Sequence, residues 1–245
     1  MSRQVKPYRQ DEAKKEQVSR MFDRIAPWYD FLNRLLSLGI DTRWRRRAIA
    51  QLQDIGPRLI LDVATGTADL ALEASRQLEP EQIIGVDISE NMLDVGRAKI
   101  ARRKGGQKIE LRAADSENLP FPDDHFDAVT VAFGVRNFEN LSRGLDEMRR
   151  VLRPGGKLVV LEFSKPRLFP FRQVFNAYFK YILPGIGRFT SKDPRAYRYL
   201  YESVQAFPDG DDFLALLDQT GYKTTACIPL SLGICSIYTG RKREA

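Results

Sequence analysis

From residue 59 onward, short apolar runs alternate with longer amphipathic stretches. The apolar runs predict five strands, over 59–64, 83–89, 109–115, 126–135 and 156–164. The amphipathic stretches predict three helices, over 69–78, 90–103 and 140–152, the last of which meets a stop signal at Arg153-Pro154-Gly155-Gly156. Strands that are apolar throughout and separated by helices indicate a parallel sheet that is covered on both faces.

The C-terminal part of the pattern is different. A helix is predicted over about 209–220, and two strands follow it, KTTACIPL (223–230) and GICSIYTG (233–240). The connection between them is too short for a helix, so these strands must pair antiparallel. Five parallel strands followed by such a pair predict an α/β fold of the class I methyltransferase type. This is a Rossmann-like, seven-stranded, mostly parallel sheet in which the last strand is antiparallel.

Two segments flank this predicted sheet within what we interpret as a single domain over 1–245. Residues 12–55 form a helical N-terminal extension, in which Phe22, Ile25 and Trp28 begin an apolar stripe. Residues 163–192 are basic, aromatic and free of acids. We expect this second segment to lie above the carboxyl ends of the strands as a lid or substrate segment, because ligands bind there in such sheets.

The composition narrows the chemistry. One histidine and two cysteines in 245 residues cannot build a His-based metal site, a zinc site or a disulfide framework, so no metal is expected. No apolar run is long enough for a membrane span. The net charge is +7, and residues 1–60 hold 13 Lys/Arg against 7 Asp/Glu, including RWRRR at 43–47. Such a run contacts nucleic acid or anionic lipid, or is simply a solvated helix face.

The turn after the first strand, LDVATGTADL (61–70), is the first candidate for a binding site. Pyrophosphate-binding turns use three glycines, whereas this turn has only Gly66. Asp69 places a negative charge in the first turn of the helix, where it would cap the free N–H groups and repel a phosphate. S-adenosylmethionine has no phosphate and fits better, with Thr67 and the turn amides contacting its methionyl part.

Acids end three consecutive strands. Asp62 can supply negative potential near the methionine ammonium, and Asp87, 21 residues after Gly66, can accept both ribose hydroxyls. Asp115, with Ser116 beside it, can accept from the adenine amine. The alternative is that each acid caps the helix that follows it.

The chain resembles the ubiquinone/menaquinone biosynthesis C-methyltransferases along most of its length. The matching segments are MFDRIAPWYDFLNRLLSLGID (21–41), LDVATGTADLA (61–71), GVDISENMLDVGRAK (85–99), NLPFPDDHFDAVTVAFGVRNF (118–138), RVLRPGGKLVVLEFSKP (150–166) and AYRYLYESVQAFPD (196–209). The resemblance places S-adenosylmethionine contacts on Thr67, Asp87 and Asp115-Ser116. Thr65, Ala132 and Asp115 depart from residues found in some members, and each departure weakens one polar contact.

The resemblance implies methyl transfer to a ring carbon of a polyprenylated naphthoquinol, converting demethylmenaquinol to menaquinol in menaquinone biosynthesis. With His125 in a polar turn, the best catalytic candidates are Arg136, as a cation beside the phenolate, and Asn137, holding a water or a ring oxygen. The alternative for Arg136 is a structural ion pair. Tyr29 and Asp30 are second-line candidates for lining the site. Tyr197 and Tyr201 could contact the ring, although tyrosines at this spacing more often serve packing.

The implied partner is the quinol, and we expect no nucleic-acid partner. The segment 163–192 and the N-terminal stripe predict a cleft for the isoprenoid tail and peripheral contact with an anionic membrane, or else a simple lid. The expected location is therefore cytoplasmic and peripheral to the membrane, and a homodimer is a further expectation. Methylation of a benzoquinol in ubiquinone synthesis, nucleic-acid binding through RWRRR, and a non-catalytic role remain as alternatives.

Overall fold

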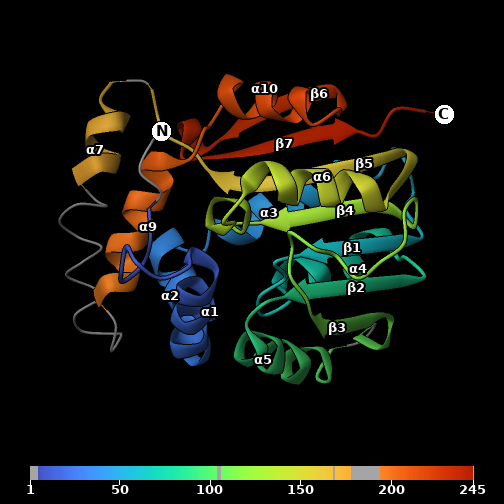
Figure 1. Ribbon diagram of the computed structural model, residues 1–245, viewed down its shortest axis with the longest axis horizontal. Coiled ribbons are helices and arrows are strands. Elements are labelled where there is room, and N and C mark those ends of the chain that lie inside the picture. Colours follow the sequence, from blue (N-terminus) through green and yellow to red (C-terminus); the bar gives the residue numbers. More distant parts are fainter. Residues whose placement is uncertain (1–4, 104–105, 168, 178–193, 245) are drawn as a thin grey trace.

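The computed structural model describes residues 5–103, 106–167, 169–177 and 194–244, and a seven-stranded sheet forms its centre (Figure 1). The strand order is β3-β2-β1-β4-β5-β7-β6. The first five strands are parallel and β7 is antiparallel to both neighbours, which confirms the predicted fold class. The strands are β1 Leu59–Val63, β2 Gln82–Asp87, β3 Ile109–Ala113, β4 Phe126–Ala132, β5 Leu152–Phe163, β6 Lys223–Leu230 and β7 Cys235–Arg241.

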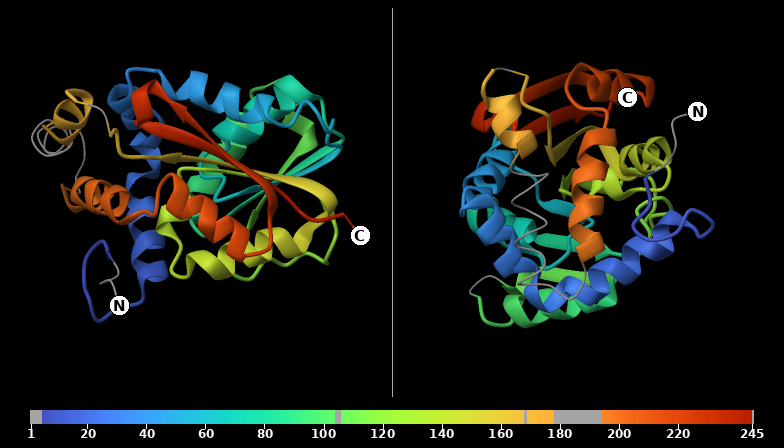
Figure 2. Two further views of the ribbon diagram at one scale, coloured as in Figure 1. Left: turned by 90° about the horizontal axis from the view of Figure 1, so that it is seen from above. Right: turned by 90° about the vertical axis from the view of Figure 1, so that its left-hand side faces the viewer.

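Helices cover both faces of the sheet and form two hydrophobic cores (Figure 2). The helices are α3 Asp41–Ala50, α4 Asp69–Leu78 and α5 Glu90–Ile100 on one face, and α6 Leu141–Val151 and α10 Asp211–Gln219 on the other. Successive side chains of a strand point to opposite faces, so Ile60 of β1 joins the first core while Leu61 and Val63 join the second. Because α3 packs in the first core through Trp44, Ala48 and Ile49, part of the N-terminal extension covers the sheet.

Two predicted strand boundaries differ from the structure by three or more residues, and both lie at residues with positive φ. The strand predicted over 126–135 ends at Ala132, because Phe133 adopts a φ of 56° and the chain turns into the 3₁₀ helix η3, Val135–Asn137. The strand predicted from 156 begins at Leu152, so the Arg153–Gly156 segment ends α6 but lies within β5. Gly155 has a φ of 75° there, and the β4–β5 register shifts between Phe126 and Ala128.

Four helices gather beyond the carboxyl ends of the parallel strands, on the left in Figure 1. These are α1 Lys14–Ile25, α2 Tyr29–Ser37, α7 Phe171–Ala177 and α9 Pro194–Ala206, with the 3₁₀ helix η1, Ala26–Trp28, between the first two. The segment expected over 163–192 is described only in part, and residues 168 and 178–192 lie outside the described residues. Among the helices of the described chain, none has the length and apolar character needed to cross a membrane.

The basic run at 43–47 is not a continuous exposed face. Trp44 and Arg45 are buried, while the other three arginines are exposed. The Trp44 indole donates a hydrogen bond to Ser231 Oγ at 2.8 Å, and Arg45 pairs with Asp41. Because of the helical periodicity, some residues of the run face the core and others face the solvent. The exposed basic surface is therefore smaller than five consecutive residues of RWRRR would give.

Candidate active site

The turn between β1 and α4 has an unusual backbone. Ala64, Gly66 and Ala68 all have positive φ, at 51°, 56° and 65°. For residues other than glycine this left-handed conformation costs free energy, and it is commonly found at ligand sites. At Gly66 a Cβ would lie 3.3 Å from Met92 Cε, so a side chain at this position would narrow the hollow in front of the turn.

Asp62, at the end of β1, stabilises this turn through hydrogen bonds. It is 1% exposed, and its two oxygens accept hydrogen bonds from Thr65 Oγ1 at 2.6 Å and from Thr130 Oγ1 at 2.7 Å. Burial raises the pKa of Asp62 to about 6. Because both oxygens already bind hydroxyls, Asp62 offers a cationic ligand mainly its negative charge.

Asp87 lies at the end of β2, facing the same turn. Its Oδ2 accepts the backbone N–H of Gly66 at 2.8 Å, and its Oδ1 accepts that of Ser89 at 2.9 Å. Burial raises the pKa of Asp87, while these two N–H groups stabilise its ionised form. An ionised carboxylate has about four lone-pair sites, so Asp87 can accept hydroxyl hydrogen bonds, such as those of a ribose, beside its bonds to the backbone.

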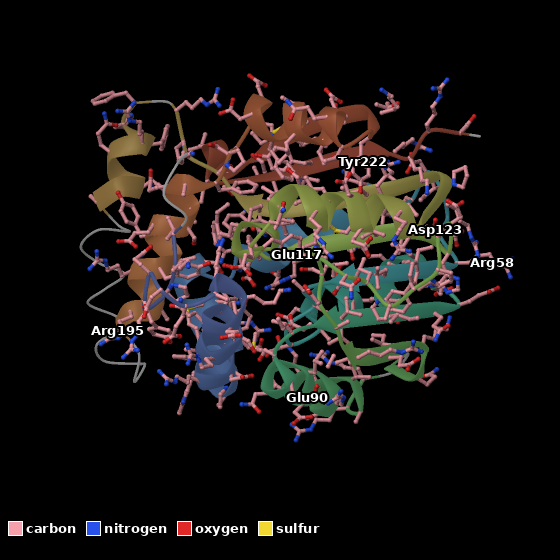
Figure 3. All side chains as sticks on the ribbon, in the orientation of Figure 1. Arg58, Glu90, Glu117, Asp123, Arg195 and Tyr222 are labelled. Carbon is pink, nitrogen blue, oxygen red and sulfur yellow. The ribbon has the colours of Figure 1, made fainter. Side chains whose placement is uncertain are left out.

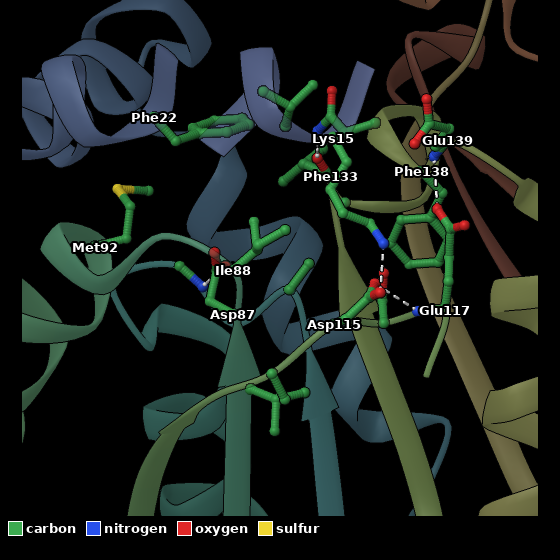
Figure 4. A pocket seen from close by; sticks show the side chains of 18 of the residues that line it. Lys15, Phe22, Asp87, Ile88, Met92, Asp115, Glu117, Phe133, Phe138 and Glu139 are labelled. Carbon is green, nitrogen blue, oxygen red and sulfur yellow. Dashed lines mark hydrogen bonds and ion pairs between the residues drawn. The ribbon is translucent and has the colours of Figure 1, made fainter. Parts of the chain in front are cut away.

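Asp115 and Ser116 line the same cavity as Asp87, beneath helix α1. Asp115 Oδ1 accepts the backbone N–H of Glu117 at 2.9 Å, and its Oδ2 forms an ion pair with Lys15. Figure 4 shows Lys15 reaching from α1 down to Asp115, on the side of the view where Glu117 and Phe138 lie, with Asp87 and Met92 farther to the left. With Lys15 in this position the free volume is about 70 Å³, so its side chain must move to admit a nucleoside.

The Thr67 hydroxyl connects the turn to helix α2. It donates to Asp30 Oδ1 at 2.6 Å and accepts from Lys99 Nζ at 3.0 Å, while Lys99 also bonds Asp30 Oδ2 at 2.6 Å. Thr67 is 2% exposed and lies beside a small cavity that Asp62, Gly66 and Arg45 also line. The hydroxyl therefore holds α2 against the turn.

The expectation that Asp69 caps α4 is wrong. The residue at the N-cap of α4 is Ala68, whose side chain makes no capping hydrogen bond. Asp69 instead pairs with Lys99 and, at 3.5 Å, with Arg45. Although desolvation opposes them, these two cations hold the pKa of Asp69 below its usual value. They also offset its charge, so Asp69 repels a phosphate less than the sequence alone suggests.

A second cavity of about 330 Å³ lies between α1, α2, α3, α7 and α9. Its wall is largely apolar, and its lining includes Met21, Ile25, Trp44, Phe163, Phe171 and Phe175. Phe22, Tyr29, Phe133 and Asn137 line both this cavity and the one in front of Asp87. The two cavities are therefore neighbours that share one wall, and Tyr29 lies in that wall as expected.

Arg136 extends from η3 into the wall of the apolar cavity and pairs with a buried acid. Its Nη1 lies 2.9 Å from Glu162 Oε1, and its guanidinium lies 5.6 Å from the ring centre of Phe163. Glu162 is fully buried in β5 and also accepts the N–H of Phe163 at 2.8 Å. Burial raises the pKa of Glu162, and Arg136 works against that shift. The structural ion pair considered for Arg136 is thus present.

Lysine 14 fixes η3 to the N-terminal helix. It is 6% exposed, and its Nζ donates to the carbonyl oxygens of Arg136 at 2.9 Å and of Phe138 at 2.8 Å. Burial, with help from the nearby Arg136, lowers the pKa of Lys14 to about 8. The position of Arg136 and Asn137 therefore depends on α1 as well as on the sheet.

Three buried polar atoms in the apolar cavity lining have no hydrogen-bond partner among the described residues. They are Arg136 Nε, Asn137 Oδ1 and the Tyr199 hydroxyl. The Asn137 amide donates its Nδ2 to Phe133 O at 3.3 Å, which leaves Oδ1 as the free atom. Buried polar groups are nearly always paired, so these three atoms are candidates for hydrogen bonds to a bound ligand.

Sequence reasoning missed Lys14, Lys15, Glu162 and Tyr199. Glu162 could have been found from the sequence, because an acid inside an otherwise apolar strand needs a partner. Of the two tyrosines considered, Tyr201 packs beside Phe175 and lines neither cavity, and the Tyr197 side chain lies outside the described part. His125 is partly exposed and stacks on Phe121, away from both cavities.

The sheet order, the acids at the strand ends and the turn without a phosphate signature define a class I methyltransferase, which takes its methyl group from S-adenosylmethionine. Comparison with known sequences gives the family. The chain belongs to the ubiE/COQ5 methyltransferase family, whose sequence profile matches residues 10–242. The family assignment confirms the resemblance noted from the motifs.

Curated relatives match nearly the whole chain. The demethylmenaquinone methyltransferase of Bacteroides fragilis is 49% identical over 238 residues, which is 97% of each chain. The ubiquinone/menaquinone biosynthesis C-methyltransferase UbiE of Geobacter sulfurreducens is 48% identical over 98% of this chain and 93% of its own. The demethylmenaquinone methyltransferase of Deinococcus radiodurans is 45% identical, over 97% of each chain.

Solved structures with this fold share little sequence with the chain. A SAM-dependent methyltransferase of Thermotoga maritima has a TM-score of 0.65 at 18% identity, over 92% of this chain and 99% of its own. Human N-acetylserotonin methyltransferase, solved in complex with SAM, has a TM-score of 0.60 at 17% identity, over 87% of this chain and 55% of its own. At these identities the likeness shows the fold alone.

Proposed function

We propose that this enzyme methylates a ring carbon of a reduced, polyprenylated naphthoquinone, converting demethylmenaquinol to menaquinol. The observation that carries the proposal is the pair of neighbouring cavities. One is lined by acids at strand ends, and the other is apolar with three unpaired polar atoms in its lining. A quinol with an isoprenoid tail has this combination of two ring oxygens and a large apolar surface. The names of the curated relatives support the same substrate class.

The donor site is proposed to use the acids as follows. Asp87 accepts the ribose hydroxyls, and Asp115 with Ser116 contacts the adenine once Lys15 has moved away. Asp62 supplies negative charge near the methionyl end, and Gly66 and Thr67 shape the turn around it. When bound, S-adenosylmethionine supplies an electrophilic methyl group on its sulfonium. The residues present fit this nucleoside, because the Asp87 carboxylate can still accept hydroxyl groups and Gly66 adds no side chain of its own to the hollow.

In the acceptor site, Arg136 and Asn137 are proposed to act on one ring hydroxyl. Loss of its proton to water gives a phenolate, which makes the adjacent ring carbon nucleophilic. Arg136 Nε donates to the phenolate oxygen, and Asn137 Oδ1 holds the water or the hydroxyl before the proton leaves. The new bond joins the ring carbon to the methyl carbon as the sulfur–carbon bond breaks. The sulfur would keep the electron pair of the broken bond as a neutral thioether, and the proton on the methylated ring carbon would pass to water, which restores the aromatic ring.

Product analysis tests this function. The enzyme is incubated with S-adenosylmethionine carrying a labelled methyl group, together with a reduced demethylated naphthoquinol or a reduced benzoquinol, and the products are identified by mass. Labelled naphthoquinol is the expected product. Label found only in the benzoquinol would instead support ubiquinone biosynthesis, which the name of the Geobacter relative also includes. Label in neither compound would overturn the proposal.

Peripheral membrane contact is proposed for the mouth of the apolar cavity. Leu38 lines this cavity and is 83% exposed. Trp28 and Phe31, which flank the cavity-lining Tyr29 in the sequence, are 60% and 57% exposed, and Arg34 and Arg43 are also exposed. Apolar residues flanked by cations suit an anionic bilayer, from which a tailed quinol could enter directly. Co-sedimentation with phosphatidylglycerol vesicles at low salt is expected, and Leu38→Asp should reduce it. The homodimer stays a prediction, which analytical ultracentrifugation tests.

A further inference from the structure

The Tyr199 hydroxyl is a buried polar group that makes no hydrogen bond to the described part of the chain, and buried polar groups usually make one. Tyr199 lies on α9, is 2% exposed and lines the apolar cavity. Its hydroxyl has no hydrogen-bond partner among the residues that the structure describes. An unpaired buried hydroxyl destabilises the free protein, since it has lost its water without gaining a partner. Its cavity position suggests that the missing partner is the substrate.

The surroundings of Tyr199 hold the ring in one place. Val18 and Met21 of α1 and Ala196 of α9 pack with it in a small hydrophobic cluster. Burial and the nearby Glu162 raise the pKa of Tyr199, which keeps its proton on the oxygen at neutral pH. The side chain is therefore a fixed, neutral hydroxyl that can donate or accept one hydrogen bond from a ligand.

The other two unpaired atoms, Arg136 Nε and Asn137 Oδ1, can together bind one hydroxyl group of a ring. Arg136 Nε can only donate, and Asn137 Oδ1 can only accept. The hydrogen bond from Asn137 Nδ2 to Phe133 O fixes this orientation of the amide, because the reverse orientation would place two acceptors together. A single hydroxyl satisfies both atoms, since it accepts from Arg136 and donates to Asn137. The Tyr199 hydroxyl is then left over, although a 1,4-quinol has a second ring oxygen.

We propose that Tyr199 binds the second ring oxygen of the substrate, the one para to the hydroxyl at Arg136 and Asn137. This inference rests on the proposed function and extends it to substrate specificity. Two fixed points on opposite sides of the ring prevent it from turning in an otherwise apolar cavity. The ring carbon adjacent to the first hydroxyl is thereby held toward Asn137 and Phe133, the wall shared with the donor cavity. Rings with one oxygen leave Tyr199 unpaired and bind less tightly.

The test compares two ligands that differ by one oxygen. They are a 1,4-dihydroxynaphthalene and the corresponding 1-hydroxynaphthalene, with the same short prenyl tail. Dissociation constants are measured anaerobically under dithionite, with S-adenosylhomocysteine present so that no turnover occurs. The wild-type enzyme should prefer the diol by about 10-fold or more, the usual effect of leaving a buried polar group unpaired. Tyr199→Phe should lose this preference or reverse it, because the second hydroxyl of the diol then has no partner.

Two controls separate a role in binding from a role in packing. Tyr201→Phe changes a tyrosine on the same helix that lines neither cavity, so it should retain the wild-type preference. Tyr199→Phe removes a hydroxyl that has no partner within the described ranges of the chain, so its melting temperature without ligand should be equal to or above that of the wild type. A lower melting temperature, with the preference for the diol retained, would make Tyr199 a packing residue and overturn the proposal.

Methyl transfer to the diol by the wild-type enzyme tests the proposed function separately. If the diol is methylated but Tyr199→Phe keeps the wild-type preference, only the assignment of Tyr199 is overturned. If the diol is not methylated, the proposed function fails. A preference that disappears in Tyr199→Phe supports the assignment in either case, because binding is measured without turnover. Equal binding of both ligands by the wild type also overturns it.

Discussion

The buried pair between Arg136 and Glu162 gives the sharpest prediction about stability. Glu162→Gln removes one negative charge and hardly changes the shape of the side chain. Glu162 is fully buried, the Arg136 side chain is 7% exposed, and their closest atoms are 2.9 Å apart. The substitution therefore leaves a guanidinium in the protein interior with no opposite charge beside it.

An unpaired buried charge of this kind strongly destabilises the folded protein. Removing one partner of a buried ion pair lowers the free energy of unfolding by about 3–5 kcal/mol, a large part of the roughly 5–15 kcal/mol that stabilises most domains. For a chain of this size the melting temperature changes by about 2–4 °C per kcal/mol. Glu162→Gln should therefore melt about 6–20 °C below the wild type.

Urea unfolding at pH 7, followed by circular dichroism, measures the loss directly, and a thermal melt gives the second value. Glu81→Gln is the matched control, because it removes the same charge from an exposed pair with Arg58 and should leave the melting temperature unchanged. The double variant Arg136→Met with Glu162→Leu should lose less than the two single variants together, since it leaves no charge unpaired. A loss below about 1 kcal/mol for Glu162→Gln, or strict additivity in the double variant, would refute the reasoning.

Three further predictions concern the donor site and helix α1. Asp87→Ala should weaken S-adenosylmethionine binding by about 100-fold or more, because two hydrogen bonds to a charged acceptor are lost; calorimetry measures this, and unchanged affinity would contradict the assignment. Lys15→Gln should bind the nucleoside up to about 5-fold more tightly at low salt, since the partly exposed ion pair with Asp115 no longer competes. For Lys14, the folded pKa of about 8 lies below the unfolded value of 10.5, so burial of the ammonium costs stability fully below pH 8. This cost disappears as the pH rises toward 10.5, so the stability of the wild type relative to Lys14→Met should increase by about 3 kcal/mol between pH 7 and 10.5, measured by urea unfolding. A difference that does not change with pH would refute this assignment of the buried charge.

The sheet and its acidic edge could be predicted because they depend on local patterns. Apolar runs separated by helices determine a parallel sheet, and the carboxyl ends of such strands must meet at one edge. Asp87 and Asp115 follow from that rule, and the structure brings them to one cavity. The partners of these acids could not be predicted. The Lys15–Asp115 pair joins residues 100 apart in the chain, and no periodicity specifies which helix covers which strand end.

Asp69 is a second example of a residue whose partners could not be predicted from the sequence. Its negative charge was read from one position, but the net effect depends on Arg45 and Lys99, which come from two other helices. Tyr199 illustrates a third case, because its importance lies in a hydrogen bond that it does not make within the described chain. A sequence indicates which residues are able to form contacts, and only coordinates show which of them remain unsatisfied.

The contact between Lys14 and η3 has a consequence for folding during synthesis of the chain. The residues that line the donor cavity end at Glu139, so all of them are synthesised well before α9. The acceptor pocket needs α1 from the start of the chain and α9 from beyond residue 193, because Met21 and Tyr199 both line it. A nascent chain that ends before α9 can therefore have a nearly finished place for the methyl donor but no pocket for the molecule that receives the methyl group.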